Sequence, residues 1–313
     1  MGILADGVWR EGWHDTGSTG GAYIRAASGF RRRVTSGGAP GSLADFPAVS
    51  GRYHLYVAKA CPWCHRAMIF RVLKKLDGVV SMSEVEPLML EKGWTFAKPD
   101  PLTGALYIHQ IYQRADPKYS GRASVPVLWD KKTDTIVNNE SSEIIRMFNR
   151  EFNAFTDDRT DYYPAGLAAE IDAVNQRVYE GFNNGVYRAG FATTQGAYEA
   201  AVKTVFETLD WLEALLSKRR TLVGDVLTEA DWRLFPTLAR FDAVYVGHFK
   251  CNLRRLTDYP ALSAYARRLY EMPGIAATCD FDEYKRHYYG SHRTINPTGI
   301  VPLGPLEDFR NAG

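Results

Sequence analysis

The fold of this chain is decided by the stretch Tyr53-His54-Leu55-Tyr56-Val57-Ala58-Lys59-Ala60-Cys61-Pro62-Trp63-Cys64-His65-Arg66. Its first six residues are β-prone, and their pattern predicts a short, half-buried strand. Pro62 suits the first position of a helix, and apolar residues then recur at helical spacing until a stop near residues 77–78. Cys61 is therefore expected at the junction between a strand and the N-terminus of a helix.

That position favours a reactive thiolate at Cys61. The unsatisfied N–H groups and the positive dipole end of a helix stabilise an anion, so this thiol should ionise more readily than an ordinary cysteine. A strand, a Cys-Pro-x-Cys string and a helix in this order are typical of a thioredoxin-like redox site. We expect Cys61 to be the nucleophile.

Three other interpretations of the same string are open. Cys-x-x-Cys-His also matches the attachment pattern of c-type haem, which normally needs an export signal. A zinc site is disfavoured because Cys251 and Cys279 have no partner at ligand spacing. The two cysteines could also be small buried residues that only pack.

Composition predicts a soluble globular protein in a reducing compartment. Of 313 residues, 45% are hydrophobic and 24% charged, and the net charge of +2 argues against nucleic acid or an anionic membrane as partner. Four cysteines are too few for a disulfide scaffold. The start of the chain lacks the apolar core of a signal peptide, and no apolar run approaches membrane-spanning length. We therefore expect a cytoplasmic location and no metal.

The pattern along the chain divides it into three parts. Residues 1–45 are rich in Gly and Ser and predict an irregular extension. Residues 46–155 alternate strands and helices and predict an α/β thioredoxin-like domain, in which residues 87–120 show no clear periodicity. Residues 160–313 show helical periodicity, with a capping box at Thr228-Glu229-Ala230-Asp231, and predict an all-α domain followed by an irregular tail.

This order of domains resembles the soluble glutathione transferases, and several motifs resemble the Xi-class glutathionyl-hydroquinone reductases more narrowly. The resemblance runs from about Trp9 to Pro305. It is carried by Cys61-Pro62-Trp63-Cys64-His65-Arg66, Gly93-Trp94-Thr95-Phe96, Val125-Pro126-Val127-Leu128-Trp129-Asp130, Asn138-Asn139-Glu140-Ser141-Ser142-Glu143, Gly185-Val186-Tyr187-Arg188-Ala189-Gly190, Thr228-Glu229-Ala230-Asp231-Trp232-Arg233 and Asn296-Pro297-Thr298-Gly299-Ile300-Val301-Pro302. One departure is Cys64, which stands where the family usually has Ala.

The resemblance implies a thiol reaction with glutathione as co-substrate. In the family, the cysteine thiolate attacks the glutathione sulfur of a glutathionyl-hydroquinone, releases the hydroquinone, and leaves a mixed disulfide that a second glutathione resolves. The helix position of Cys61 agrees with this nucleophilic chemistry. The family also implies a homodimer.

The resemblance also implies the residues that bind the substrate. The glutathione site is expected to consist of Trp94, Arg122, Val125, Glu140 and Ser141. In it, the Val125 backbone would pair with the cysteinyl part, Glu140 and Ser141 would hold the γ-glutamyl end, and Trp94 and Arg122 would lie near the sulfur and the glycyl end.

Tyr187 and Tyr288 match family tyrosines that face the quinol ring, where hydroxyl donors suit a phenolic leaving group. Each site residue also has a plainer interpretation: a helix cap for Glu140 and Ser141, a surface cation for Arg122, and a core aromatic ring for Trp94 and both tyrosines.

Two further functions stay open on the sequence alone. A glutaredoxin-like dithiol oxidoreductase or dehydroascorbate reductase would use Cys61 and Cys64 together. A binding module on the same fold would use neither.

Overall fold

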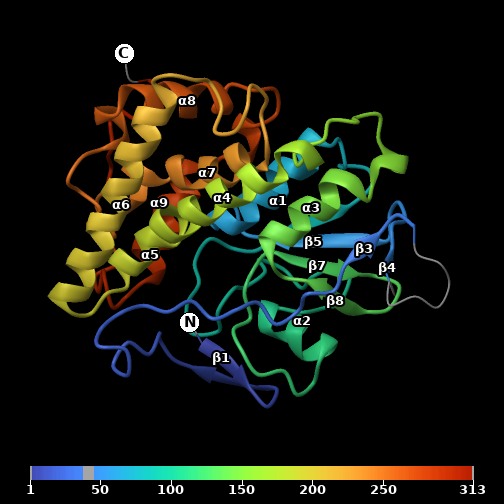
Figure 1. Cartoon of the computed structure of the whole chain (residues 1–313). Coiled ribbons are helices and arrows are strands. Elements are labelled where there is room, and N and C mark those ends of the chain that lie inside the picture. The colour runs from blue at the N-terminus through green and yellow to red at the C-terminus, as the bar shows by residue number, and fades with distance from the viewer. Residues whose placement is uncertain (1, 38–45, 312–313) are drawn as a thin grey trace. The chain divides into compact units, whose positions relative to one another are not determined.

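The computed structural model describes residues 2–37 and 46–311, which form two compact units (Figure 1). The first unit comprises Met1–Trp13 and Ala26–Asp161, and the second comprises His14–Arg25 and Tyr162–Gly313. A short N-terminal piece of the chain therefore belongs to the unit that is otherwise built from the second half.

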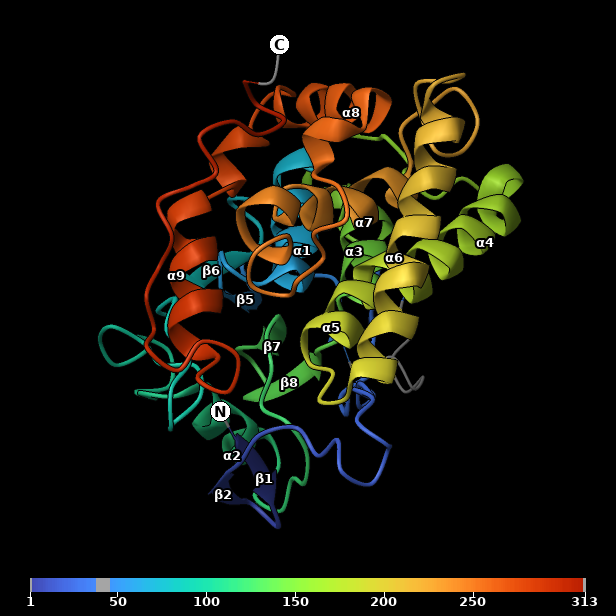
Figure 2. The ribbon, with the colours of Figure 1, turned by 90° about the vertical axis from the view of Figure 1, so that its left-hand side faces the viewer.

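The first unit is built on a four-stranded sheet in the order β6-β5-β7-β8. The strands are β5 (Tyr53–Val57), β6 (Ser81–Glu84), β7 (Val127–Asp130) and β8 (Thr135–Asn138). β5 and β6 are parallel, whereas β7 runs antiparallel to both β5 and β8. Helices α1 (Pro62–Leu73) and α3 (Ser141–Arg150) cover one face, and α2 (Ile108–Ala115) lies on the other (Figures 1 and 2). This is the predicted thioredoxin-like arrangement.

Burial of the central strand differs from the expectation. All five residues of β5 are buried, not half of them. The reason is the cover of helices on both faces of the sheet, which leaves a central strand no solvent-facing side. Helix α1 also ends at Leu73, earlier than its apolar pattern suggested, because Lys75 has a left-handed backbone with a φ of 51°.

The N-terminal extension is more regular than predicted. Its first residues form a hairpin of β1 (Gly2–Ala5) and β2 (Val8–Glu11), joined at Asp6 and Gly7 with φ values of 52° and 74° (Figure 2). Two positive φ angles in sequence suit the right-handed twist of a tight hairpin. Further on, β3 (Val34–Thr35) pairs in parallel with β4 (Phe46–Pro47). Residues 38–45 of the predicted extension lie outside the described residues.

The end of the first unit is anchored by a buried lysine. Lys74 is fully buried, and its Nζ donates to the Thr160 carbonyl at 2.7 Å and the Asp158 carbonyl at 3.0 Å. The segment predicted as a linker, residues 153–163, begins with a 3-10 turn (η1, Asn153–Phe155). The hydrogen bonds from Lys74 fix the later part of this segment to the end of α1.

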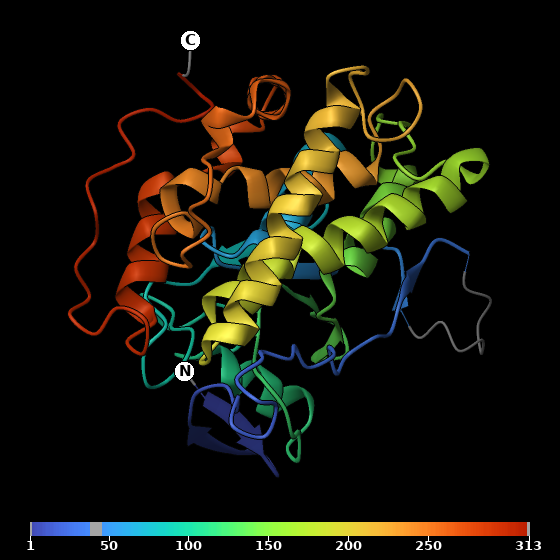
Figure 3. The same cartoon turned by 60° about the vertical axis from the view of Figure 1, so that its left-hand side comes forward.

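The second unit is helical, as predicted. Its elements are η2 (Ala165–Leu167), α4 (Ala168–Val178), η3 (Tyr179–Asn183), α5 (Gly185–Gly190), α6 (Gln195–Leu216), α7 (Glu229–Leu238), η4 (Phe241–Tyr245), η5 (Leu256–Asp258), α8 (Pro260–Tyr270), η6 (Ala276–Thr278) and α9 (Phe281–Ser291). The long helix α6 packs against α5 and α8 (Figure 3). Among the helices of the described residues, none is both long enough and apolar enough to cross a bilayer.

The predicted capping box starts α7. The Thr228 side chain accepts from the Ala230 N–H, and the Asp231 carboxylate accepts from the Thr228 N–H at 2.8 Å. Asp231 also accepts from the Leu222 N–H at 3.0 Å and from the Tyr265 hydroxyl at 2.8 Å. One fully buried carboxylate thus joins the helix start to the preceding loop and to α8.

Candidate active site

Cys61 is the residue that precedes α1, as the sequence predicted. Its backbone is extended (φ −79°, ψ 121°), Pro62 occupies the first turn, and the Cys61 carbonyl accepts from the His65 N–H at 3.0 Å. The Cys61 Sγ lies 3.6 Å from the Val125 carbonyl oxygen, and the residue is 8% exposed. The sulfur is thus held at the dipolar end of the helix, in a residue that is largely buried.

The backbone segment opposite this sulfur immediately precedes strand β7 and is not part of it. The Val125–Pro126 peptide bond is cis, and β7 begins only at Val127. Because β7 begins only at Val127, the backbone groups of Val125 lie outside the strand ladder, and the Val125 carbonyl lies beside the thiol. An extended peptide that reaches Cys61 can pair with such a backbone segment in the manner of an added strand.

Glu140 and Ser141 lie at the start of α3. The Glu140 carboxylate accepts from the Ser142 N–H at 3.1 Å, the Ser142 hydroxyl at 2.9 Å and the Ser28 hydroxyl at 3.0 Å. Burial raises the pKa of Glu140, but these hydrogen bonds and the charge of Arg66 outweigh burial and lower it overall. Glu140 is therefore a fixed carboxylate that caps its helix, and a cap of this kind can also receive an ammonium group.

Arg66 connects α1 to the same helix start. This buried arginine on α1 donates to the Ser141 hydroxyl at 3.5 Å, and its guanidinium lies 4.6 Å from the centre of the Trp63 ring. Arg66 belongs to the cysteine motif, and the sequence predicted no binding role for it. Arg66 is buried beside Ser141 because α1 packs against the start of α3, and no local sequence pattern predicts that contact.

Arg122 and Trp94 belong to the same unit as Cys61. The Arg122 guanidinium donates to the carbonyls of Gly2 at 3.4 Å and Trp13 at 3.2 Å, so it contacts the N-terminal extension. Trp94 is 7% exposed, and its carbonyl accepts from the Ile108 N–H at the start of α2. Their roles in binding glutathione remain predictions.

Cys64 is fully buried on α1. Its Sγ accepts from the Ala58 N–H at 3.4 Å, at the end of the strand that leads to Cys61. A small apolar residue of this volume can fill the site that the family usually gives to Ala. Burial disfavours attack by Cys64 on a mixed disulfide, because a resolving thiol needs access.

Tyr187 and Tyr288 belong to the helical unit, on α5 and α9, and their hydroxyl oxygens are 2.5 Å apart. The Tyr288 hydroxyl is also 3.2 Å from that of Tyr245, at the end of η4. Burial, followed by the neighbouring Tyr187 and Tyr245, raises the pKa of Tyr288 well above its ordinary value. The structure thus joins both predicted tyrosines in one cluster of neutral hydroxyl groups.

The third member of this cluster, Tyr245, was missed as a site residue. Its four-residue spacing from Phe241 indicated an ordinary apolar helix face. The hydroxyl groups meet through packing between residues 43 and 101 positions apart in sequence, so no local pattern predicts their contact.

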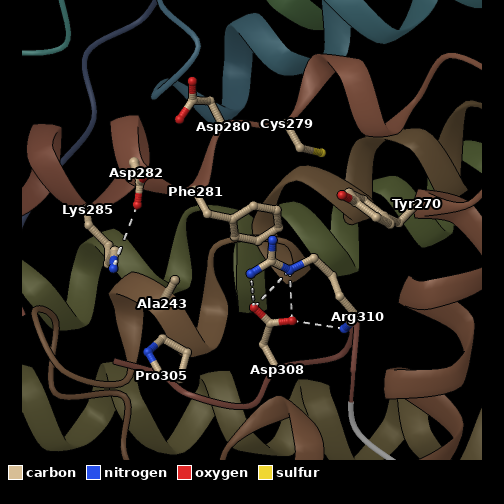
Figure 4. Close-up of a pocket in the computed structure, with 10 residues that line it drawn as sticks. All are labelled: Ala243, Tyr270, Cys279, Asp280, Phe281, Asp282, Lys285, Pro305, Asp308 and Arg310. Carbon is tan, nitrogen blue, oxygen red and sulfur yellow. Dashed lines mark hydrogen bonds and ion pairs between the residues drawn. The ribbon is translucent and has the colours of Figure 1, made fainter. Parts of the chain in front are cut away.

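A separate polar cavity of about 320 Å³ lies within the helical unit (Figure 4). It is lined by Ala243, Tyr270, Cys279, Asp280, Phe281, Asp282, Lys285, Pro305, Asp308 and Arg310. Arg310 forms an ion pair with Asp308 at 2.7 Å and lies 3.6 Å from the centre of the Phe281 ring, and Lys285 pairs with Asp282 at 4.0 Å. None of the predicted site residues lines this cavity.

Within residues 2–37 and 46–311, no group of three or more His, Cys, Asp or Glu side chains is arranged to hold a metal ion.

Comparisons with known proteins match the whole chain. Residues 60–151 match the family "Glutathione S-transferase, N-terminal domain", and residues 195–268 match its C-terminal counterpart. The chain is 54% identical to "Glutathionyl-hydroquinone reductase YqjG" of Escherichia coli strain K12, across 99% of this chain and 97% of the relative.

Many solved structures are similar, among them two that match more than nine tenths of the chain. The glutathione-bound structure of YqjG has a TM-score of 0.89 at 50% identity, covering 99% of this chain and 97% of that one. Glutathione-S-transferase Xi from Phanerochaete chrysosporium has a TM-score of 0.88 at 49% identity, covering 91% and 98%.

Proposed function

The chain belongs to the glutathione S-transferase family, in its Xi class of glutathionyl-hydroquinone reductases, and on that premise we propose that it reduces glutathionyl-hydroquinones through a Cys61–glutathione mixed disulfide. Glutathione is the co-substrate. The observation that carries the proposal is the position of Cys61 before α1, with its Sγ 3.6 Å from the carbonyl that precedes the cis proline.

In the first step, the Cys61 thiolate attacks the glutathione sulfur of the substrate. A sulfur–sulfur bond forms as the bond between that sulfur and the ring carbon breaks. Before the attack, the ring carbon that carries the sulfur takes up a proton as the neighbouring hydroxyl group loses one, so that the ring is a ketone. The electron pair of the broken bond then restores the aromatic ring and places negative charge on that oxygen, which is protonated as the ring leaves as the hydroquinone. The position at the helix N-terminus favours the thiolate that this attack requires.

In the second step, another glutathione thiolate attacks the mixed disulfide. Glutathione disulfide leaves, and the Cys61 thiolate is restored. The sum is one glutathionyl-hydroquinone and one glutathione converted to one hydroquinone and one glutathione disulfide, so the two glutathione sulfurs supply the two electrons gained by the ring carbon. The covalent mixed disulfide thus divides one difficult reaction, between glutathione and the substrate, into two easier steps.

The residues around Cys61 support a defined pose for glutathione. The backbone groups of Val125 suit the cysteinyl amide, because the Val125 carbonyl lies beside Cys61 and outside the ladder of β7. The Glu140 carboxylate suits the γ-glutamyl ammonium, and Ser141 at the start of α3 suits the adjoining carboxylate. Trp94 and Arg122 are proposed for the sulfur and glycyl ends.

Tyr187 and Tyr288 are proposed to bind the quinol ring. A neutral phenol donates a hydrogen bond, and the ring oxygen gains negative charge as the carbon–sulfur bond breaks. Donors fixed before the reaction stabilise such charge without reorganisation. The three-hydroxyl cluster of Tyr187, Tyr288 and Tyr245 supports this role.

The two rival functions have weaker support. A dithiol mechanism needs an accessible Cys64, which is fully buried. A binding module does not require the arrangement of Cys61 and the cis Val125–Pro126 bond. A homodimer and a cytoplasmic location remain proposals, and light scattering of the purified protein tests the dimer.

Replacing Cys61 with Ser tests the proposed function. We expect no reduction of a glutathionyl-hydroquinone in the presence of glutathione, and no mass adduct after exposure to glutathione disulfide. Cys279→Ser, at a partly exposed thiol of the helical unit, is the matched control and should keep both properties. Turnover by Cys61→Ser would refute the mechanism.

A further inference from the structure

Arg25 lies over one of the proposed quinol-binding tyrosines. Its guanidinium carbon is 4.8 Å from the centre of the Tyr187 ring and 5.6 Å from that of Tyr23. Its Nε donates to the side-chain oxygen of Asn184 at 2.8 Å, and Asn184 directly precedes α5, which carries Tyr187. One arginine is thus fixed both to the ring and to the start of its helix.

The backbone that carries Arg25 is well anchored in the same unit. The segment His14–Arg25 belongs to the helical unit. The Thr16 and Thr193 hydroxyl oxygens are 2.9 Å apart, and the Thr193 N–H donates to the Gly21 carbonyl at 3.0 Å. The Tyr23 ring meets the Phe191 ring edge-on at 5.0 Å. Arg25 is therefore held in place over Tyr187 by its neighbours along the chain.

A cation at this position acts on the hydroxyl cluster through the ring. The positive charge is attracted to the π-electrons of Tyr187, and this attraction is stronger where water is excluded. Withdrawal of electron density makes the Tyr187 hydroxyl a stronger hydrogen-bond donor. That hydroxyl is 2.5 Å from Tyr288, so the effect reaches both residues proposed to face the quinol.

We propose that Arg25 is a positioning residue of the quinol-binding cluster, whose charge strengthens hydrogen-bond donation by Tyr187 to the phenolate oxygen that develops on the leaving ring. This inference rests on the proposed function. The charge of Arg25 should increase kcat/KM most for electron-rich hydroquinones, because their phenolates are the least stable and need the strongest hydrogen-bond donors.

The test compares Arg25→Met, which keeps length and loses charge, with Arg25→Lys, which keeps charge but not the planar guanidinium. Reduction is measured on glutathionyl-hydroquinones with methylated, unsubstituted and chlorinated rings. We expect kcat/KM of Arg25→Met to fall about tenfold on the methylated ring and less than threefold on the chlorinated ring, within the range of a cation–π contact. Arg25→Lys should recover part of the loss.

Two controls separate this effect from damage to the fold. Arg177→Met removes another arginine of the helical unit, whose guanidinium lies 3.9 Å from the centre of the Trp211 ring, and should keep wild-type rates on every ring. The second step, attack of glutathione on glutathionylated Cys61, involves no quinol, so Arg25→Met should perform it at the wild-type rate.

The outcomes distinguish this inference from its premise. Equal rates for wild type and Arg25→Met across the rings would overturn the role of Arg25 and leave the proposed function standing. An equal loss on every ring and on the ring-free step would also overturn it, because only a structural role predicts that result. Turnover by Cys61→Ser would overturn the proposed function and this inference with it.

Discussion

Replacing Tyr288 with Phe removes one hydroxyl group from the centre of the cluster and leaves the ring in place. Tyr288 is 1% exposed, and its oxygen lies 2.5 Å from that of Tyr187 and 3.2 Å from that of Tyr245. The substitution therefore breaks two hydrogen bonds between buried hydroxyl groups. A hydrogen bond contributes about 0.5–1.5 kcal/mol, so we expect the loss of two to lower the free energy of unfolding by about 1–3 kcal/mol.

The expected effect on catalysis is larger than that on stability. If Tyr288 donates to the developing phenolate, its loss should lower kcat about 10²–10³-fold, the range seen when one donor to a reacting oxyanion is removed. KM should change little, because the hydrogen bond strengthens mainly as charge develops. The assay is steady-state formation of hydroquinone, followed by chromatography, together with urea unfolding of the same preparation.

The matched control is Tyr265→Phe. Tyr265 is also 1% exposed, and its hydroxyl donates to Asp231 at 2.8 Å. This variant should lose similar stability and keep its kcat. If Tyr288→Phe behaves like Tyr265→Phe, with lower stability and unchanged kcat, then Tyr288 is a core residue and the proposed binding role is wrong.

Three further predictions concern the rest of the chain. Cys64→Ala should keep kcat and the rate of regeneration from the glutathionylated form; a slower regeneration would revive the dithiol mechanism. Asp231→Ala should lower the free energy of unfolding by about 3–5 kcal/mol, because two buried backbone N–H groups and the Tyr265 hydroxyl lose the carboxylate that accepts from them. A loss below about 1 kcal/mol in urea would contradict this. Burial holds down the pKa of three histidines: His54 (about 4), His248 (about 3) and His292 (well below its ordinary value). Since the unfolded chain binds protons there more readily, stability should fall as pH drops from 7 to 5, by roughly 2 kcal/mol for His54 and again for His248, with His292 acting in the same direction. Asp242, whose pKa burial raises to about 6, opposes this by only about 1–2 kcal/mol, so thermal unfolding should show a net loss, and a flat profile would count against it.

Local signals in the sequence predicted the elements that position Cys61. The β-prone run before it, the proline after it and the polar residues before α3 each act over a few neighbouring residues. The capping box of Thr228 and Asp231 is a local device as well, and it starts α7 as predicted. Where the residues that determine an element lie within that element or next to it, the sequence alone predicts the element.

Other elements were missed because their causes lie elsewhere in the chain. Helix α2 (Ile108–Ala115) has only eight residues and follows Tyr107, which is not a common capping residue, so residues 87–120 showed no period. The Asp6-Gly7 pair is a recognised hairpin signal, but the Gly- and Ser-rich composition around it suggested an irregular segment. The hydroxyl cluster and Arg25 depend on packing between distant segments.

The short segment His14–Arg25 has a practical consequence for dissecting this protein. The polypeptide passes from one unit to the other three times, after Trp13, after Arg25 and after Asp161. A single proteolytic cut near residue 161 therefore leaves His14–Arg25, a piece of the second unit, covalently attached to the first. A truncated protein that starts at residue 162, or that lacks the first few dozen residues, would lose His14–Arg25 and so a piece of the helical unit. We expect such a protein to be less soluble than the full chain, and its solubility should be measured before its activity.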